Sequence, residues 1–166
     1  MNSGMAAHSG FASLCAVAIV IAVSQSRADI ESVTIDMPVS VAFYVLDMSE
    51  TTVGVPTPTT FTFTAAHLNT GHSMRISAKA GATTFAGPSG TQIPASNISW
   101  SVSGASGGSG VAGMLDASSY RDLFDSITNP SQGRCDITFK LAPLPAHVHA
   151  GMHSLNIVWK VESLGY

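Results

Sequence analysis

The segment "RCDITFKL", residues 134–141, alternates strictly between apolar and polar side chains. Cys135, Ile137, Phe139 and Leu141 form the apolar set, and the residues between them are charged or hydroxylated. Successive side chains of a β-strand point to opposite faces of its sheet. The segment therefore predicts a strand with one buried face and one solvated face.

The same two-residue period recurs along most of the chain. The clearest further examples are ESVTIDM (31–37), VSVAFYVL (39–46), TTFTFTA (59–65), SMRISAK (73–79), NISWSVS (97–103) and HSLNIVWKVES (153–163). Strands with one apolar face are typical of antiparallel sheets, whereas the strands of parallel sheets are apolar on both faces. So many half-buried strands cannot bury their apolar faces within one layer. The sequence predicts an all-β fold, an antiparallel two-sheet sandwich of the immunoglobulin-like or jelly-roll kind.

One segment, "SSYRDLFDSITNP" at residues 118–130, departs from this period. Its apolar residues Tyr120, Leu123, Phe124 and Ile127 have the spacing of one helix face, and a proline ends the run. We therefore predict one short helix near residues 118–127. The alternative is a strand with a bulge.

The N-terminal part of the chain has the features of an export signal. Residues 11–23 form an apolar run of 13, which is too short to cross a bilayer core of about 30 Å as a helix. Small residues at Ser26 and Ala28 favour cleavage after Ala28. The expected organisation is a signal peptide at residues 1–28 and one β-sandwich domain at 29–166, which would be secreted, periplasmic or at the cell surface. Because no Lys or Arg precedes the apolar run, an uncleaved membrane tether is the alternative.

Charge and cysteine content exclude several kinds of partner. Removing Arg27 from the seven basic residues leaves six against ten acidic ones, a formal charge of −4. Such a chain lacks the basic surface that nucleic acids or anionic lipids attract, so we expect no nucleic-acid partner and no membrane association after cleavage. Only Cys135 remains of the two cysteines, which excludes an internal disulfide. Its phase within the strand predicts a buried core residue.

The segment "AHVHAGMHS", residues 146–154, is the candidate metal site. His147 and His149 are two residues apart, so on a strand both would point to one side at roughly 7 Å. With His153 and Met152 they would suit copper or zinc. The alternative is a turn before the last strand, with His153 facing the core. On that alternative the protein needs no cofactor.

No catalytic residues emerge from the sequence, and we do not expect an enzyme. The segment "GASGG", residues 104–108, matches the G-x-S-x-G nucleophile pattern around Ser106. That nucleophile needs a helix directly after it, and the glycine-rich continuation here opposes one. The carboxylates form no pair with a spacing that indicates acid–base work.

Three features of the chain resemble a known class of exported protein. They are the Ser/Thr/Val-rich strands, the predicted export signal and the ending "AGMHSLNIVWKVES" (residues 150–163). The chain is similar in style to the small exported β-sandwich subunits of bacterial surface fibres, fimbriae and spore-coat-like layers. The resemblance implies a structural role, often with exchange of strands between subunits.

These observations together predict an exported, non-catalytic structural or adhesive component of a cell surface or matrix. Its partners would be further copies of itself or other surface subunits, joined by β-strand addition. The expected donors are the strands at 31–37 and 39–46, and their apolar residues are Val33, Ile35, Val41 and Phe43. The alternatives are a metal-binding protein that uses the histidines above, and a carbohydrate-binding module.

Overall fold

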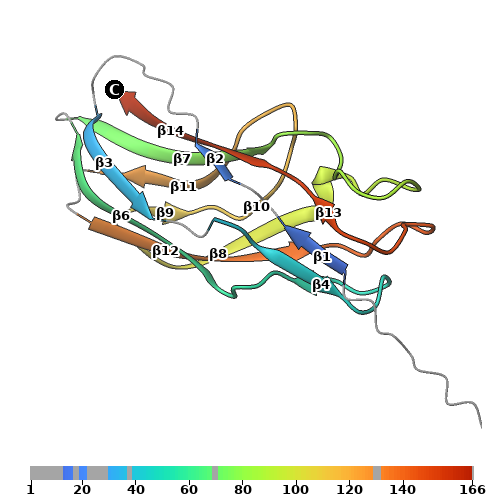
Figure 1. Cartoon of the computed structure of the whole chain (residues 1–166). Coiled ribbons are helices and arrows are strands. Elements are labelled where there is room, and N and C mark those ends of the chain that lie inside the picture. The colour runs from blue at the N-terminus through green and yellow to red at the C-terminus, as the bar shows by residue number, and fades with distance from the viewer. Residues whose placement is uncertain are drawn as a thin grey trace, which may run out of the picture.

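The computed structural model describes residues 13–16, 19–21, 30–36, 39–68, 71–128 and 132–165. Within these residues the chain forms β-strands joined by turns and one short 3-10 helix, η1, at Ala95–Asn97. The strands form two antiparallel sheets that pack against each other (Figure 1). The all-β, two-sheet sandwich predicted from the alternation is therefore confirmed.

One sheet is built around the strand that contains the alternating segment 134–141. In spatial order it contains β10 (Gly113–Met114), β8 (Ile98–Ser106), β12 (Gln132–Leu141), β6 (Thr59–Leu68) and β3 (Ile30–Asp36). The short strand β5 (Thr52–Val53) also pairs with β12, near the end of that strand. All neighbours in this sheet are antiparallel.

The other large sheet faces the first one. In spatial order it contains β2 (Ile19–Ile21), β14 (Ile157–Gly165), β7 (His72–Ala80), β11 (Arg121–Ile127) and β9 (Ser109–Gly110). Its neighbours are antiparallel except β2, which runs parallel to β14. The Phe61 and Trp159 rings, with centroids 4.9 Å apart, join the two sheets across the core.

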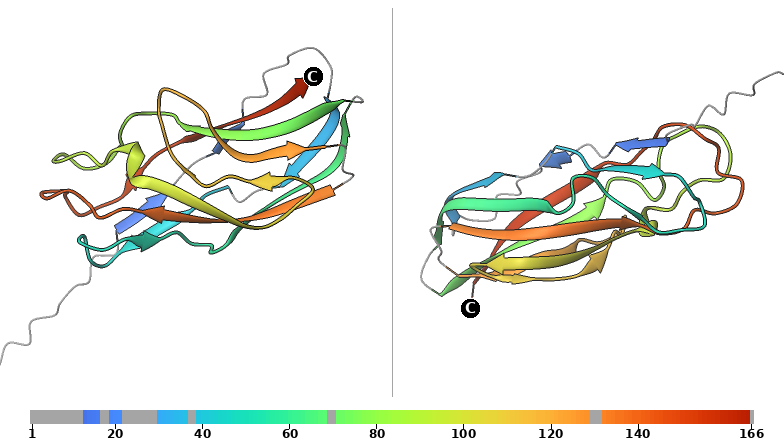
Figure 2. Two further views of the ribbon diagram at one scale, coloured as in Figure 1. Left: turned by 180° about the vertical axis from the view of Figure 1, so that it is seen from behind. Right: turned by 90° about the horizontal axis from the view of Figure 1, so that it is seen from below.

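A small third sheet closes one side of the sandwich. It consists of β13 (His153–Ser154), β1 (Ser13–Ala16) and β4 (Ala42–Val45), with β1 in the middle (Figures 1 and 2). An isolated bridge between Ala42 and Val55 links β4 to the segment that follows β5 of the first sheet, and β13 leads directly into β14 of the second. β1 therefore joins the two sheets along this side.

The described members of the apolar sets predicted from the alternation lie in the core or pack against it, except Val39, which is exposed. Ile137, Phe139, Trp100 and Trp159 are all buried, as their phase predicts. Gly133 of β12 pairs with Phe63 of the neighbouring strand β6, and a Cβ built on Gly133 would lie 1.9 Å from Cζ of Phe63. Only a residue without a side chain lets the Phe63 ring lie against this backbone.

The predicted helix near residues 118–127 is wrong: these residues contain the strand β11. Its pairing with β7 is interrupted twice, between Asp122 and Phe124 and again between Phe124 and Ile127. Each irregularity shifts the phase of the side chains, so the adjacent residues Leu123 and Phe124 are both buried. Bulges thus reproduce the i, i+3, i+4 spacing of a helix face, and the strand with a bulge was the correct alternative.

Candidate functional site

The histidine segment is a loop that leads into β13. His153 is buried, as its phase predicts, and its Nε2 donates a hydrogen bond to the His149 carbonyl oxygen over 2.9 Å. Its ring also packs against Gly87, where a Cβ would lie 2.2 Å from Nδ1. His153 is thus a core residue that fixes the turn before the final strand.

The remaining candidates for a metal site do not converge with His153. His147 and His149 are exposed, and the exposed fraction of Met152 is 58%. Among the described residues no three His, Cys, Asp or Glu side chains are grouped so that they would hold a metal ion. The geometry therefore gives no support to copper or zinc binding at residues 146–154.

The candidate strand-addition residues divide between two strands. Val41 and Phe43 are buried in the core beside β4, and Ile35 of β3 packs against that core. Val33 belongs to β3 by its backbone, and its side chain lies outside the described part of the chain. β3 pairs with β6 on one side, and no other described strand pairs with it. It is therefore an edge strand, whereas β4 has neighbours on both sides.

A group of exposed apolar residues lies on and around β4 and β5. These residues, called here the β4–β5 patch, are Val39, Tyr44, Leu46, Val53 and Val55. The antiparallel bridge between Ala42 and Val55 brings the segment that follows β5 beside the start of β4. Leu46 is 92% exposed and Val39 is 82% exposed, so the patch presents nearly whole aliphatic side chains to water.

Sequence reasoning found only part of this patch. Tyr44 has the outward phase of its strand, which the alternation identifies correctly. Val39 has the apolar phase of Val41 and Phe43, so the alternation places it inside, whereas it precedes the first residue of β4 and lies in water. No periodic signal identifies Val53 and Val55, because β5 is only two residues long.

The outer face of the second sheet has the opposite character. Arg75 lies 3.4 Å from Asp122 and 3.3 Å from Asp125, measured between Nε and the carboxylate oxygens. Lys79 and Lys160 both lie over the ring of Tyr120, at 4.9 and 5.6 Å from its centroid. Charged groups on this face are thus paired with one another and remain hydrated, which is typical of a solvated surface.

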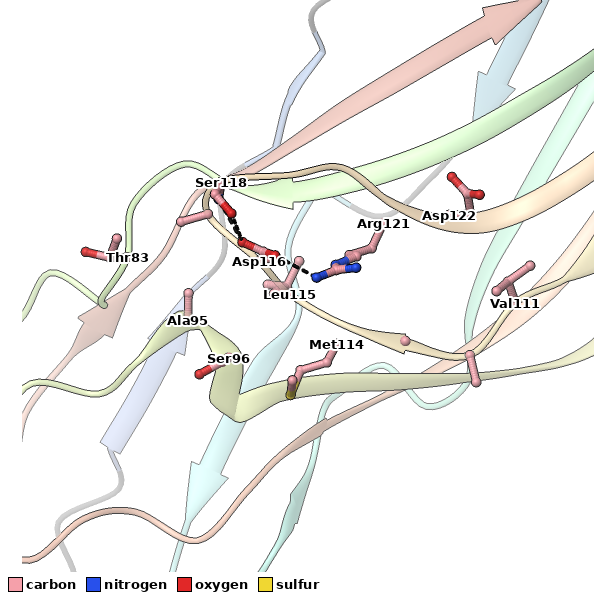
Figure 3. Close-up of a pocket in the computed structure, with 13 residues that line it drawn as sticks. Thr83, Ala95, Ser96, Val111, Met114, Leu115, Asp116, Ser118, Arg121 and Asp122 are labelled. Carbon is pink, nitrogen blue, oxygen red and sulfur yellow. Dashed lines mark hydrogen bonds and ion pairs between the residues drawn. The ribbon is translucent and has the colours of Figure 1, made fainter. Parts of the chain in front are cut away.

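A hollow of about 600 Å³ lies between η1 and the loop that precedes β11 (Figure 3). The Asp116 carboxylate on its wall accepts hydrogen bonds from the Ser118 N–H and hydroxyl, from the Ser119 hydroxyl and from Arg121. These donors, Ser118 first, hold the pKa of Asp116 well below its ordinary value. The carboxylate therefore stabilises the loop, and its hydrogen-bonding capacity is used within that loop.

Cys135 is buried on β12, as predicted, and forms no disulfide. Removal from water, with a smaller contribution from the nearby Asp136 charge, raises the pKa of its thiol to about 12. The thiolate is the reactive form of cysteine, so this side chain acts as a small apolar core residue.

Comparisons with known proteins add no family. No protein-family model matches this sequence, and no curated protein is similar to it. In the described part of the chain, no helix has the length and apolar character needed to cross a membrane. The predicted cleavage site at Ala28 lies outside the described residues, which include only 13–16 and 19–21 of the predicted signal peptide.

Proposed function

We propose that this protein is an exported, non-catalytic structural or adhesive component of a cell surface or matrix, and that it assembles by β-strand addition. The observation that carries the proposal is the β4–β5 patch. The patch includes Tyr44 of β4, the strand that pairs with β1. Its partners are further copies of the chain or other surface subunits.

The patch has the chemistry of a contact surface. Contiguous exposed apolar groups on a soluble domain mark interaction sites or aggregation hazards, whereas single exposed apolar residues need no explanation. Burying one Val or Leu side chain completely contributes about 1.5–3 kcal/mol. Four Val or Leu residues and Tyr44, on and around β4 and β5, therefore offer a driving force for association that the solvated outer face of the second sheet does not.

The charge distribution supports association between copies. Only Asp47 and Glu50 are charged within residues 39–55, so two patches can approach each other without strong repulsion. The carboxylate of Asp47 is already hydrogen-bonded to the N–H and hydroxyl of Ser49.

The first experiment is light scattering with electron microscopy on a chain of residues 29–166. We expect ordered oligomers or polymers that form above a threshold concentration. A chain that stays monomeric at high concentration would contradict the proposal.

A matched pair of variants then tests the patch itself. The double variant Tyr44→Lys, Leu46→Glu keeps the core intact, and we expect it to raise the threshold concentration at least tenfold. The control is Ser101→Lys, an exposed position on β8 in the same sheet, which should leave the threshold unchanged. Equal effects of the two changes would show that added charge, and not the patch, controls association.

A further inference from the structure

The side of the sandwich closed by β1 depends on residues that belong to the predicted signal peptide. β1 pairs with β13 through Cys15 and His153, and with β4 through Cys15 and Phe43. Because neighbouring strands lie about 4.8 Å apart, β4 and β13 without β1 would face each other across roughly 9.6 Å, the room of one strand. Phe43 and His153, both buried, lie in register with this gap.

The gap continues along β14. β2 pairs in parallel with the start of that strand, and Ile157, Val158 and Trp159 are its partners. β1 and β2 thus form one strip that lies beside β13 and β14 in turn (Figure 1). The space that they occupy is called here the acceptor slot. Cleavage after Ala28 would remove both strands and leave the edges of β4, β13 and β14 unpaired.

Unpaired edges are templates for another strand, since their N–H and C=O groups lack partners. We propose that the acceptor slot in the processed chain is filled by β3, Ile30–Asp36, of a second copy. This inference rests on the proposed function, because it names the surface and the segment through which the copies join.

Three features make β3 the donor. It is an edge strand, so it can leave its own sheet by breaking only its hydrogen bonds with β6. The pairing of β3 with β6 is also interrupted at two places. β3 has seven residues, as many as β1 and β2 contain together. It also follows directly after the predicted cleavage site, so in the processed chain no preceding segment would tether its N-terminal end.

The exchange replaces one irregular ladder by ladders on both sides of the donor strand. In the slot, β3 would pair with β4 and with β13, as β1 does now. Donor and acceptor are different surfaces of one chain, so each copy offers both. Such head-to-tail contacts generate rings or open filaments rather than closed pairs.

Cross-linking between two cysteine variants of residues 29–166 tests the exchange. One variant is Thr34→Cys on the donor strand, and the other is Val158→Cys on β14, at the edge vacated by β2. A thiol cross-linker of about 10 Å reach tolerates a register difference of two residues, which is roughly 7 Å along a strand. We expect the mixed pair to yield at least tenfold more linked heterodimer than Thr34→Cys mixed with the control Ser101→Cys.

Each outcome separates the inference from the proposed function. Polymers without preferential linkage of 34 to 158 would overturn the inference and leave the proposed function standing. Preferential linkage between two copies of Val158→Cys would also overturn it, because it indicates slot-to-slot pairing. A strictly monomeric chain would overturn both.

A shortened chain gives an independent readout. Residues 39–166 lack the donor and keep the slot, so they should not polymerise alone, and they should end the growth of filaments of the 29–166 chain when added in small amounts. Circular dichroism checks that the shortened chain is folded. Unchanged assembly of a folded 39–166 chain would refute the role of β3.

Discussion

β12 and β4 have the same alternating pattern and occupy different positions in the fold. β12 has ten residues and pairs along its length with β6 and β8, all within the predicted mature domain. β4 has four residues, and its longest ladder is with β1, from the predicted signal peptide. Figure 1 shows β12 in the middle of its sheet and β4 at the side where the third sheet lies.

The comparison shows that alternation and edge pairing are separate properties of a strand. Alternation reports which face is buried, and in this respect Phe139 and Phe43 are equivalent core residues. Edge pairing decides whether a strand depends on a neighbour that the predicted cleavage after Ala28 would remove. Function is therefore expected at β4, whose neighbour β1 belongs to the predicted signal peptide, and stability at β12.

Thiol reactivity should show the largest contrast between the two regions. At pH 8 a thiol with the pKa of Cys135, about 12, is ionised to about one part in ten thousand, whereas an ordinary thiol is ionised to about a quarter. In residues 29–166, Val53→Cys on exposed β5 should react with an aromatic disulfide reagent at least a thousandfold faster than Cys135. Rates within tenfold of each other would mean that the core around β12 opens readily.

The next contrast is steric. Gly133→Val on β12 forces a side chain into the Phe63 ring, and we expect it to lower the free energy of unfolding by about 3 kcal/mol. Ser101→Val, exposed on the neighbouring strand β8, is the control and should change stability by less than about 0.5 kcal/mol. Urea denaturation measures both. A small effect of Gly133→Val would show that β12 and β6 separate at little cost.

A comparison of truncations tests the dependence of β4 on β1. Ile137→Ala on β12 should cost about 3 kcal/mol both in the full chain and in residues 29–166. Phe43→Ala should cost about 3–5 kcal/mol in the full chain and at least about 1 kcal/mol less in residues 29–166, where β1 no longer pairs with β4. If the loss is the same in both chains, β1 contributes nothing to the packing of Phe43. Stability is measured in dilute solution, below the threshold for assembly.

The smallest expected effect is on acid stability. Hydrogen bonds from Thr60 and Arg134 lower the pKa of Asp136 on β12. The ionised Asp136 carboxylate therefore stabilises the folded chain above the pKa of an unfolded Asp, about 3.9, and this stabilisation is lost as the pH falls below that value. Asp136→Asn should therefore lose less stability than the unmodified chain between pH 5 and pH 2.5. Asp47 is the control, because its partner Ser49 is only two residues away and is also nearby in the unfolded chain, whereas Thr60, the first partner of Asp136, is 76 residues away. Asp47→Asn should lose as much stability as the unmodified chain.

Much of the fold could be predicted from the sequence because burial in a strand follows a local rule. The inward phases of Ile137, Trp159 and His153 were all correct. The prediction failed at β11, where bulges depend on pairing with β7, far away in the sequence. Of the residues in the β4–β5 patch, the alternation indicates exposure only for Tyr44, because the other members lie outside regular strands or in a very short one.

By itself the sequence determined the class of fold, the buried face of each regular strand and the inert character of Cys135, because these follow from the order of side chains along the chain. Only the tertiary structure decided which strands lie at an edge and which neighbour fills each gap, because these depend on contacts between distant segments. β1 between β4 and β13 is such a contact, and no periodicity in residues 13–16 or 42–45 encodes it.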